Sequence, residues 1–355
     1  MASRIVGWRI AATLIVAAWA WSPSASAALS GRVYVASQDG AAISVIDVET
    51  HELIATVDLT ALGFSANCKP HHVAVEPDGS HWYVSLIADW RVLKFDRDNN
   101  LVGQVEFETP GMLSLDPTDD LLYVGRSMAA VSPPTRIGVI ERSSMTIEEI
   151  DVFFARPHAL IANPTDEVVY TASLAENRIA TVLPSEEGLE LLDIPGGTHT
   201  FVQFAISPAG TTMVAGGQIS GEILVFDISD SHNPILQKRL PLGGQPWHPV
   251  YSRDGSLVYF PQRTANAVAV IDTSTWEFVD QISGGGLYEP HGSAISQDGR
   301  WLFVSGRNTG GAYGDVAEGA KPPGTLTVID TESRQVVKVI EVPAYAAGVG
   351  AATTR

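Results

Sequence analysis

One two-strand pattern recurs along nearly the whole chain. A β-branched run is followed by an acidic or polar turn and then by a second apolar run, and this happens seven times. The first copy runs from Ser44 to Val57 and the second from Val92 to Phe107. The others begin at Ile137, Ile179, Ile223, Val268 and Leu326. Repeats of this spacing indicate stacked units that bury one another's apolar faces.

A second hairpin precedes most copies, and its strands are joined by residues that favour tight turns. These turns are Glu76–Gly79, Asp116–Asp119, Asn163–Asp166, Ser207–Gly210, Arg253–Gly255 and Gln297–Gly299. Proline, glycine, asparagine and aspartate tolerate the backbone angles that a tight strand reversal needs. Each repeat is therefore expected to form four antiparallel strands. The sequence predicts an all-β fold, a seven-bladed β-propeller.

The two ends of the repeated region complement each other. The first hairpin lacks an innermost strand because only residues 32–36 precede it, whereas residues 346–351 remain after the last hairpin. We expect the C-terminal strand to complete the first blade and close the ring, which covers sheet edges that would otherwise invite aggregation. This closure predicts a single propeller domain over residues 28–355.

The first 27 residues have the composition of a secretory signal peptide. Arg4 and Arg9 precede an apolar run over residues 10–21, and Ala25-Ser26-Ala27 forms a small-residue cleavage site. No later segment supplies roughly 18 uninterrupted apolar residues, so we expect no membrane span in the mature chain. The predicted location is periplasmic or secreted.

The charge and the missing motifs exclude several functions. A formal net charge of -18 repels phosphate backbones, so nucleic acid is not an expected partner. The sequence contains no glycine-rich phosphate loop, serine-nucleophile elbow or paired-cysteine metal motif. Cys68 is the single cysteine, which rules out an intramolecular disulfide.

Six of the nine histidines fall where the chain enters the innermost strand of a blade. When the turns are aligned, one position holds a histidine in three repeats and the next position in two, while a sixth histidine lies three residues upstream. These residues are His71, His158 and His291, then His72 and His248, and finally His199. The entering segments share one face of a propeller, so we expect the six side chains to converge at the mouth of its channel.

Clustered imidazoles without paired acids favour a transition metal. Imidazole suits copper, zinc, iron and nickel, whereas calcium and magnesium prefer oxygen ligands. Six histidines exceed the three protein ligands of an open catalytic zinc site. We therefore expect copper, ahead of zinc, iron or haem, in an oxidoreductase that acts on a small-molecule substrate and passes electrons to an external partner.

Six further residues are candidates for supporting roles at the same mouth. Arg126, Arg263 and Arg307 follow corresponding strands and are expected to bind an anionic substrate or a cofactor carboxylate. Cys68 precedes His71 by three residues and is a candidate soft ligand, with a buried free thiol as the alternative. The remaining two are Trp247, as a pocket wall, and Glu289, which lies beside His291.

Several strand motifs resemble a known family. The segments 33–47, 258–272 and 302–330, with Val-Tyr-Val, Val-Tyr-Phe and Leu-Phe-Val strands each leading to Val-Ile-Asp, are similar to the YVTN family of exported propellers. This resemblance covers almost the whole mature chain and implies the fold rather than an activity, since propellers host many functions.

The histidine order resembles that of the copper cluster in the nitrous oxide reductase propeller. That resemblance implies that the six histidines are copper ligands. The chain departs from the pattern at Gly111-Met112, where a histidine would fall. Other functions remain open at this point: a non-enzymatic protein that binds or delivers a metal or haem, a protein-interaction scaffold, and a lactonase-like hydrolase, for which Glu289 is the nearest acid.

Overall fold

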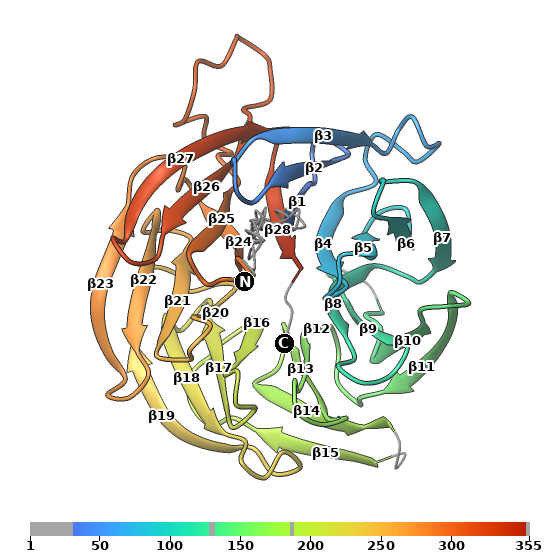
Figure 1. The fold of residues 1–355 in the computed structure, drawn as a ribbon. Coiled ribbons are helices and arrows are strands. Elements are labelled where there is room, and N and C mark those ends of the chain that lie inside the picture. The colour runs from blue at the N-terminus through green and yellow to red at the C-terminus, as the bar shows by residue number, and fades with distance from the viewer. Residues whose placement is uncertain (1–30, 128–131, 185–187, 353–355) are drawn as a thin grey trace, which may run out of the picture. The chain divides into compact units, whose positions relative to one another are not determined.

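The computed structural model describes residues 31–127, 132–184 and 188–352, and the predicted signal peptide lies outside these residues. They form seven four-stranded antiparallel sheets arranged as blades in a ring (Figure 1). The prediction of a seven-bladed propeller is thereby confirmed. None of the described segments forms a helix with the length and hydrophobicity needed to cross a bilayer.

Each blade runs from an innermost strand at the channel to an outermost strand at the rim. The innermost strands are β28 (Ala346–Ala351), β4 (Pro70–Val75), β8 (Pro110–Leu115), β12 (Pro157–Ala162), β16 (Phe201–Ile206), β20 (Val250–Tyr251) and β24 (Pro290–Ile295). The second strands are β1 (Arg32–Ser37), β5 (His81–Leu86), β9 (Leu121–Arg126), β13 (Val169–Ser173), β17 (Thr212–Gly217), β21 (Leu257–Gln262) and β25 (Trp301–Gly306).

The outer half of each blade is a further hairpin. The third strands are β2 (Ala42–Asp47), β6 (Arg91–Asp96), β10 (Arg136–Glu141), β14 (Arg178–Leu183), β18 (Glu222–Asp227), β22 (Ala267–Asp272) and β26 (Gly324–Asp330). The outermost strands are β3 (Leu53–Asp58), β7 (Leu101–Glu106), β11 (Thr146–Asp151), β15 (Gly188–Asp193), β19 (Ile235–Pro241), β23 (Glu277–Ser283) and β27 (Gln335–Val342).

The C-terminal strand closes the ring as the sequence predicts. β28 pairs with β1 in antiparallel register, with Tyr34 opposite Gly350, so the first blade combines both ends of the propeller (Figure 1). Burial follows strand position. All but the first residue of β1 are buried, whereas β7 alternates between exposed and half-buried residues because its outer face meets solvent.

The apolar core lies between neighbouring blades. Trp82 of β5 stacks on Phe95 of β6 with 4.1 Å between ring centres, and Tyr34 of β1 approaches Trp82 to 4.8 Å. These three fully buried side chains join the first blade to the second. Aromatic contacts of this kind add to the stabilisation that area burial provides. The ring therefore holds the starts of its inner strands in fixed relative positions.

Most inner strands carry a β-bulge near their start. In β4 the register shifts between Pro70 and Val73, and β24 shifts between Pro290 and Ser293. β8, β12 and β16 have comparable shifts. A bulge adds an unpaired residue and re-aims the side chains around it. It lies where the predicted histidines fall, so it controls which of them point into the channel.

Close packing of inner strands requires glycine at one position beside the bulge of β4. A Cβ on Gly348 of β28 would overlap the carbonyl oxygen of His71 and lie 2.7 Å from the Cα of His72. We expect Gly348→Ala to lower the free energy of unfolding by about 1–3 kcal/mol, as overpacking does. Urea unfolding measures the change. Gly310→Ala is the control because nothing lies within 4 Å of its Cβ position, and equal stabilities of the two variants would contradict this packing.

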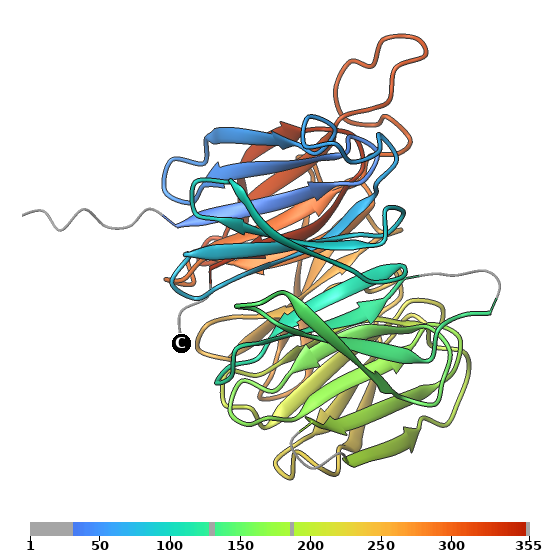
Figure 2. The same cartoon turned by 90° about the vertical axis from the view of Figure 1, so that its right-hand side faces the viewer.

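One insertion changes the outline of the ring. The chain between β25 and β26 projects beyond the blades (Figure 2). Asn308 anchors its base, because its side-chain amide donates to the carbonyl oxygens of Tyr313 and Pro323 at 2.9 Å each. The loop lies on the same face of the ring as the crossings that carry the histidines. It follows β25, a second strand, and the crossings follow outermost strands such as β23, and second and outermost strands end at the same face.

Candidate functional site

The channel contains a cavity toward each end of the inner strands. The mouth cavity, about 390 Å³, is lined by His71, His158 and His291 at the starts of β4, β12 and β24. The far cavity, about 420 Å³, is lined by later residues of the same strands, such as Val75. His72 borders the far cavity, as alternation along a strand predicts for the neighbour of His71.

Five of the six predicted histidines form one contact network between these cavities, called the histidine cluster below. The imidazole of His71 lies 5.4 Å from that of His158 and 5.7 Å from that of His291, measured between ring centres. His248 is 4.6 Å from His291 and 6.2 Å from His72. The cluster thus joins histidines from four blades that are far apart in sequence.

Some cluster nitrogens have defined hydrogen-bond partners. Nδ1 of His158 lies 2.9 Å from the carbonyl oxygen of Arg126, so Nδ1 carries the proton and Nε2 keeps a lone pair. The backbone N–H of Leu113 donates to Nδ1 of His72 at 3.3 Å. The Gln38 amide contacts Nδ1 of His71 at 2.8 Å, and an amide can present either its NH₂ group or its carbonyl oxygen.

Other cluster nitrogens are buried without a hydrogen-bond partner. They are Nε2 of His71, Nε2 of His248 and Nδ1 of His291. Buried polar atoms are paired in most native structures, and an exception calls for a physical explanation such as a bound ion or water. Three such exceptions on contacting imidazoles make the cluster a candidate binding site.

Burial keeps the cluster uncharged near neutral pH. Desolvation lowers the pKa of His72 to about 3 and that of His158 to about 4. It also holds the pKa values of His71, His248 and His291 well below the usual range, with the neighbouring histidines adding to the effect. Neutral imidazole is the form that binds metal ions, so the protonation state of the cluster is compatible with ligation.

The donor atoms are not yet gathered around one point. Within residues 31–127, 132–184 and 188–352, no group of three or more His, Cys, Asp or Glu side chains could hold a metal ion as it stands. The contacts of the cluster are between ring faces and edges rather than between nitrogens aimed at a shared centre. Ligation therefore requires the imidazoles to rotate.

A cationic aromatic wall borders the cluster. The indole of Trp247 contacts His291 edge-on, with 4.5 Å between ring centres. The guanidinium groups of Arg263 and Arg307 each lie 5.3 Å from the centre of that indole, a distance that allows a cation–π interaction. Glu289 lies 3.3 Å from Arg307 and 3.8 Å from Arg263, so this acid fixes the arginines and does not join the cluster.

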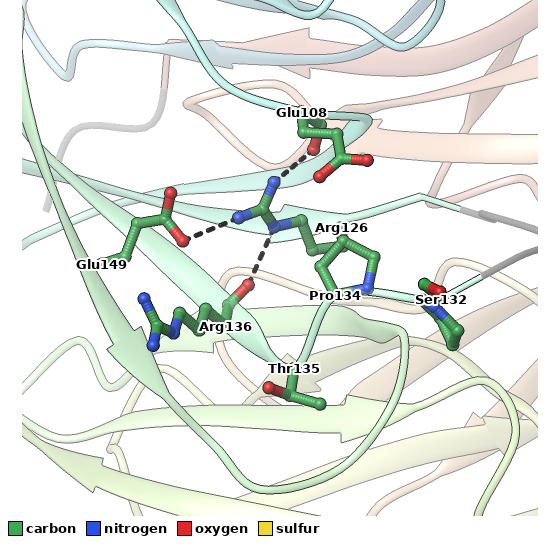
Figure 3. A pocket seen from close by; sticks show the side chains of 8 residues that line it. Glu108, Arg126, Ser132, Pro134, Thr135, Arg136 and Glu149 are labelled. Atoms are coloured by element: carbon green, nitrogen blue, oxygen red, sulfur yellow. Dashed lines mark hydrogen bonds and ion pairs between the residues drawn. The ribbon is translucent and has the colours of Figure 1, made fainter.

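Arg126 lies in a separate cavity of about 310 Å³ and differs from the other two arginines (Figure 3). Its guanidinium donates to Glu149 at 2.9 Å and to the carbonyl oxygens of Arg136 and Glu108 at 2.9 and 2.5 Å. The side chain stands over the ring of Phe107 and is only 3% exposed. The backbone carbonyl of Arg126 therefore orients His158, while its guanidinium pairs with Glu149 within its own blade.

Two further candidates lie away from the cluster. Nδ1 of His199 contacts Ser220 at 3.0 Å, and its Nε2 accepts from Arg239 at 3.2 Å. This loop position, upstream of β16, directs the imidazole into its own blade. Cys68 is buried in the apolar core between the first two blades, where desolvation raises the pKa of its thiol to about 11. The position of Cys68 is that of the buried free thiol, the alternative to a metal ligand.

Sequence reasoning did not identify two residues at the cavity. Gln38 comes directly after β1, outside the positions that the turn alignment compares. Its side chain contacts His71 of the neighbouring blade. Arg156 lines the mouth cavity from the crossing into β12. Its place two residues before His158 is the signal that could have revealed it. The crossing into β12 thus contributes both a histidine, His158, and an arginine, Arg156, to the mouth cavity.

The fold and the site define a class of protein, a seven-bladed β-propeller with buried histidines from several blades at one channel mouth. No protein-family model matches the chain, and no curated protein matches it. The YVTN and nitrous oxide reductase resemblances therefore stay predictions.

Solved structures share the fold. A functionally unknown protein from Desulfotomaculum acetoxidans DSM 771 is 16% identical with a TM-score of 0.72, covering 92% of this chain and 100% of that one. Kuenenia stuttgartiensis hydrazine synthase is 18% identical with a TM-score of 0.64, covering 79% and 89%. A streptogramin B lyase is 13% identical with a TM-score of 0.65, covering 77% and 86%. At these identities the comparisons establish the propeller fold alone.

Proposed function

We propose that this propeller is exported, holds a copper ion in its histidine cluster and acts as an oxidoreductase. His71, His158, His248 and His291 are the proposed ligands. The observation that carries this proposal is the set of three buried imidazole nitrogens without partners on contacting residues. Once the imidazoles rotate toward one another, a single cation could be shared among these nitrogens, whereas a purely structural cluster leaves each one unpaired.

The composition of the cluster favours copper over the hard cations. Its donors are neutral imidazole nitrogens, and the described residues that line the mouth cavity include no carboxylate. Calcium and magnesium need oxygen ligands, while copper accepts imidazole and leads the affinity series of divalent metals. A bound copper ion would supply one-electron chemistry. The surrounding residues orient the ligands, as the Arg126 carbonyl does for His158.

Metal retention tests this proposal. The chain beginning at Ala28 is incubated with copper(II), desalted and analysed for metal by mass spectrometry. We expect the wild type to keep copper in a fixed ratio to protein, and the His71→Gln/His158→Gln double variant to lose most of it because two ligands are gone. His232→Gln, at an exposed turn, is the matched control. Equal retention by all three proteins would end the proposal.

His199 provides a sharper control within the predicted set. It satisfies the same sequence expectation as the cluster histidines, but its two ring nitrogens contact Ser220 and Arg239. We therefore expect His199→Gln to retain as much copper as the wild type in the same assay. Loss of copper from this variant, with its circular dichroism spectrum unchanged, would contradict the exclusion of His199 from the cluster.

The redox part of the proposal has its own test. The electron paramagnetic resonance signal of the copper(II) protein should disappear on addition of ascorbate and return in air, with the metal still bound after desalting. Release of copper on reduction, or a signal that does not return, would leave a metal-binding protein without the proposed activity. Export is tested by N-terminal sequencing of the periplasmic fraction, where Ala28 is the expected first residue.

A further inference from the structure

The lining of the mouth cavity has an unusual charge for this chain. The whole sequence carries a formal charge of -18. The described residues that line the cavity nevertheless include three arginines, Arg156, Arg263 and Arg307, and no aspartate or glutamate. A cationic cavity in an acidic protein concentrates anions locally.

Two buried hydrogen-bond donors at this cavity have no acceptor, and a metal ion could not serve as one. Nε of Arg307 and Nε1 of Trp247 are both buried and unpaired, and the two residues are 6% and 8% exposed. Both groups only donate hydrogen bonds, so neither can bind a cation. They lie on the wall beside His291. The proposed copper ion therefore leaves these two donors unsatisfied, and an acceptor is required.

The arginine network is arranged to leave donors available. One carboxylate oxygen of Glu289 forms ion pairs with both Arg307 and Arg263, at 3.3 and 3.8 Å. Its other oxygen accepts from the backbone N–H of Thr309 at 2.8 Å. One acid thus shares two cations, which leaves a net positive charge facing the indole of Trp247. Arg263 has a side chain 29% exposed, against 7% for Arg307, so Arg263 is the member with room to move when a ligand enters.

Part of the remaining wall of the mouth cavity is apolar, although Gln38, Ser127, Thr200, Gln218 and the histidines also line it. Ile87, Leu174 and Val202 line it together with the aromatic residues Trp247 and Tyr345. A hydrated inorganic anion gains nothing from such a surface, whereas an organic ligand buries apolar area there. A volume of about 390 Å³ lies within the range of small-molecule sites.

We propose that the mouth cavity binds a small organic carboxylate, whose oxygens accept from Arg307, Arg263 and Trp247 and whose apolar body contacts the aliphatic wall. This inference deepens the proposed function by naming the substrate class for the same site. Ligand entry displaces the side chains that cover the two donors, and Arg263 moves off the indole as it does so.

Isothermal titration of the mature chain with benzoate tests this inference. Benzamide has nearly the same shape without the charge, acetate has the charge without the apolar body, and phosphate is an inorganic anion. We expect benzoate to bind at least about tenfold more tightly than each of the other three, because a hydrogen bond to a charged group contributes about 1.5–3 kcal/mol. Equal affinity for benzamide, or tighter binding of phosphate, would overturn the proposal.

Variants locate the binding site. Trp247→Phe removes the indole donor but keeps the ring, and Arg263→Gln removes one guanidinium. Each should weaken benzoate binding by roughly tenfold. Arg300→Gln, a control with the same charge change, alters a residue on the inner-hairpin turn at the opposite face and should leave affinity unchanged. Circular dichroism shows whether each variant is folded, and unchanged affinity in both folded test variants would refute the site.

The titration also separates this inference from the copper proposal. It is carried out on protein treated with EDTA and again on protein treated with copper(II) and desalted. Benzoate binding in both samples by a protein that fails to retain copper would support the carboxylate site and end the metal proposal. Copper retention without benzoate binding in either sample would do the reverse.

Discussion

Lowering the pH of the metal-free protein from about 7.5 to about 5 is expected to remove at least about 4 kcal/mol of folding stability, a large part of what holds a typical domain folded. The effect comes from five buried histidines that fold in the neutral form. Their unfolded pKa is about 6.5. In the folded protein desolvation lowers the pKa of His158 to about 4 and that of His72 to about 3, and the other three also lie well below the usual range.

The sign follows from proton binding. Below about pH 6.5 the unfolded chain binds a proton at each of these histidines while the folded chain does not, so acid favours unfolding. His72 and His158 each contribute about 2 kcal/mol over this interval, the other three histidines act in the same direction, and the loss continues until the pH reaches the folded pKa values. Stability therefore begins to fall as the pH drops through about 6.5 and continues to fall to about pH 3, the folded pKa of His72.

Urea unfolding at several pH values measures this dependence. His158→Gln should reduce the total loss by about 2 kcal/mol, because one neutral buried imidazole is absent. His232→Asn, at an exposed turn, should leave the pH profile as it is in the wild type. A wild-type protein equally stable at pH 7.5 and 5 would show that the five histidines are not buried together in solution.

Replacing His248 by leucine is expected to stabilise the metal-free protein and to abolish its response to copper. Nε2 of His248 is buried without a partner, and removing such a group recovers about 1–3 kcal/mol. Copper should stabilise the wild type by about 4 kcal/mol when free metal is a thousandfold above its dissociation constant. His248→Leu should gain much less, because the site has lost a ligand next to His291.

Thermal unfolding with and without copper gives both numbers. His248→Gln serves as the comparison, because it removes the imidazole but keeps a buried polar group and should not gain stability without metal. If His248→Leu is less stable than the wild type without metal, His248 supports the packing of the channel. That outcome, together with a normal copper response, would contradict the role assigned to it.

The repeat predicted the fold well because its signals are local. Turn residues such as Asp78 and Gly79 fix strand reversals wherever they occur, and alternating apolar runs fix which faces are buried. Ring closure was also predictable, since β28 had no partner within its own repeat and the first blade lacked a strand. Each of these inferences needs only short-range sequence order and the general need to cover sheet edges.

The site was harder to predict because it depends on direction as well as position. Alignment placed His71, His158 and His291 correctly at the starts of inner strands, but it also included His199, whose loop turns toward Arg239. The bulges that re-aim these residues leave no signature in a single sequence. Arg126 lies one register position before Arg307, because it is opposite Pro110 whereas Gly306 is opposite Pro290, and its guanidinium pairs with Glu149 away from the mouth cavity.

The central claim is that imidazoles from different blades share one metal ion. A crystal of the copper-treated mature chain, with data collected above and below the copper absorption edge, tests this directly. We predict one anomalous peak among His71, His158, His248 and His291, with nitrogen ligands at about 2.0 Å. A peak confined to exposed histidines such as His232, with the cluster unchanged, would contradict the claim.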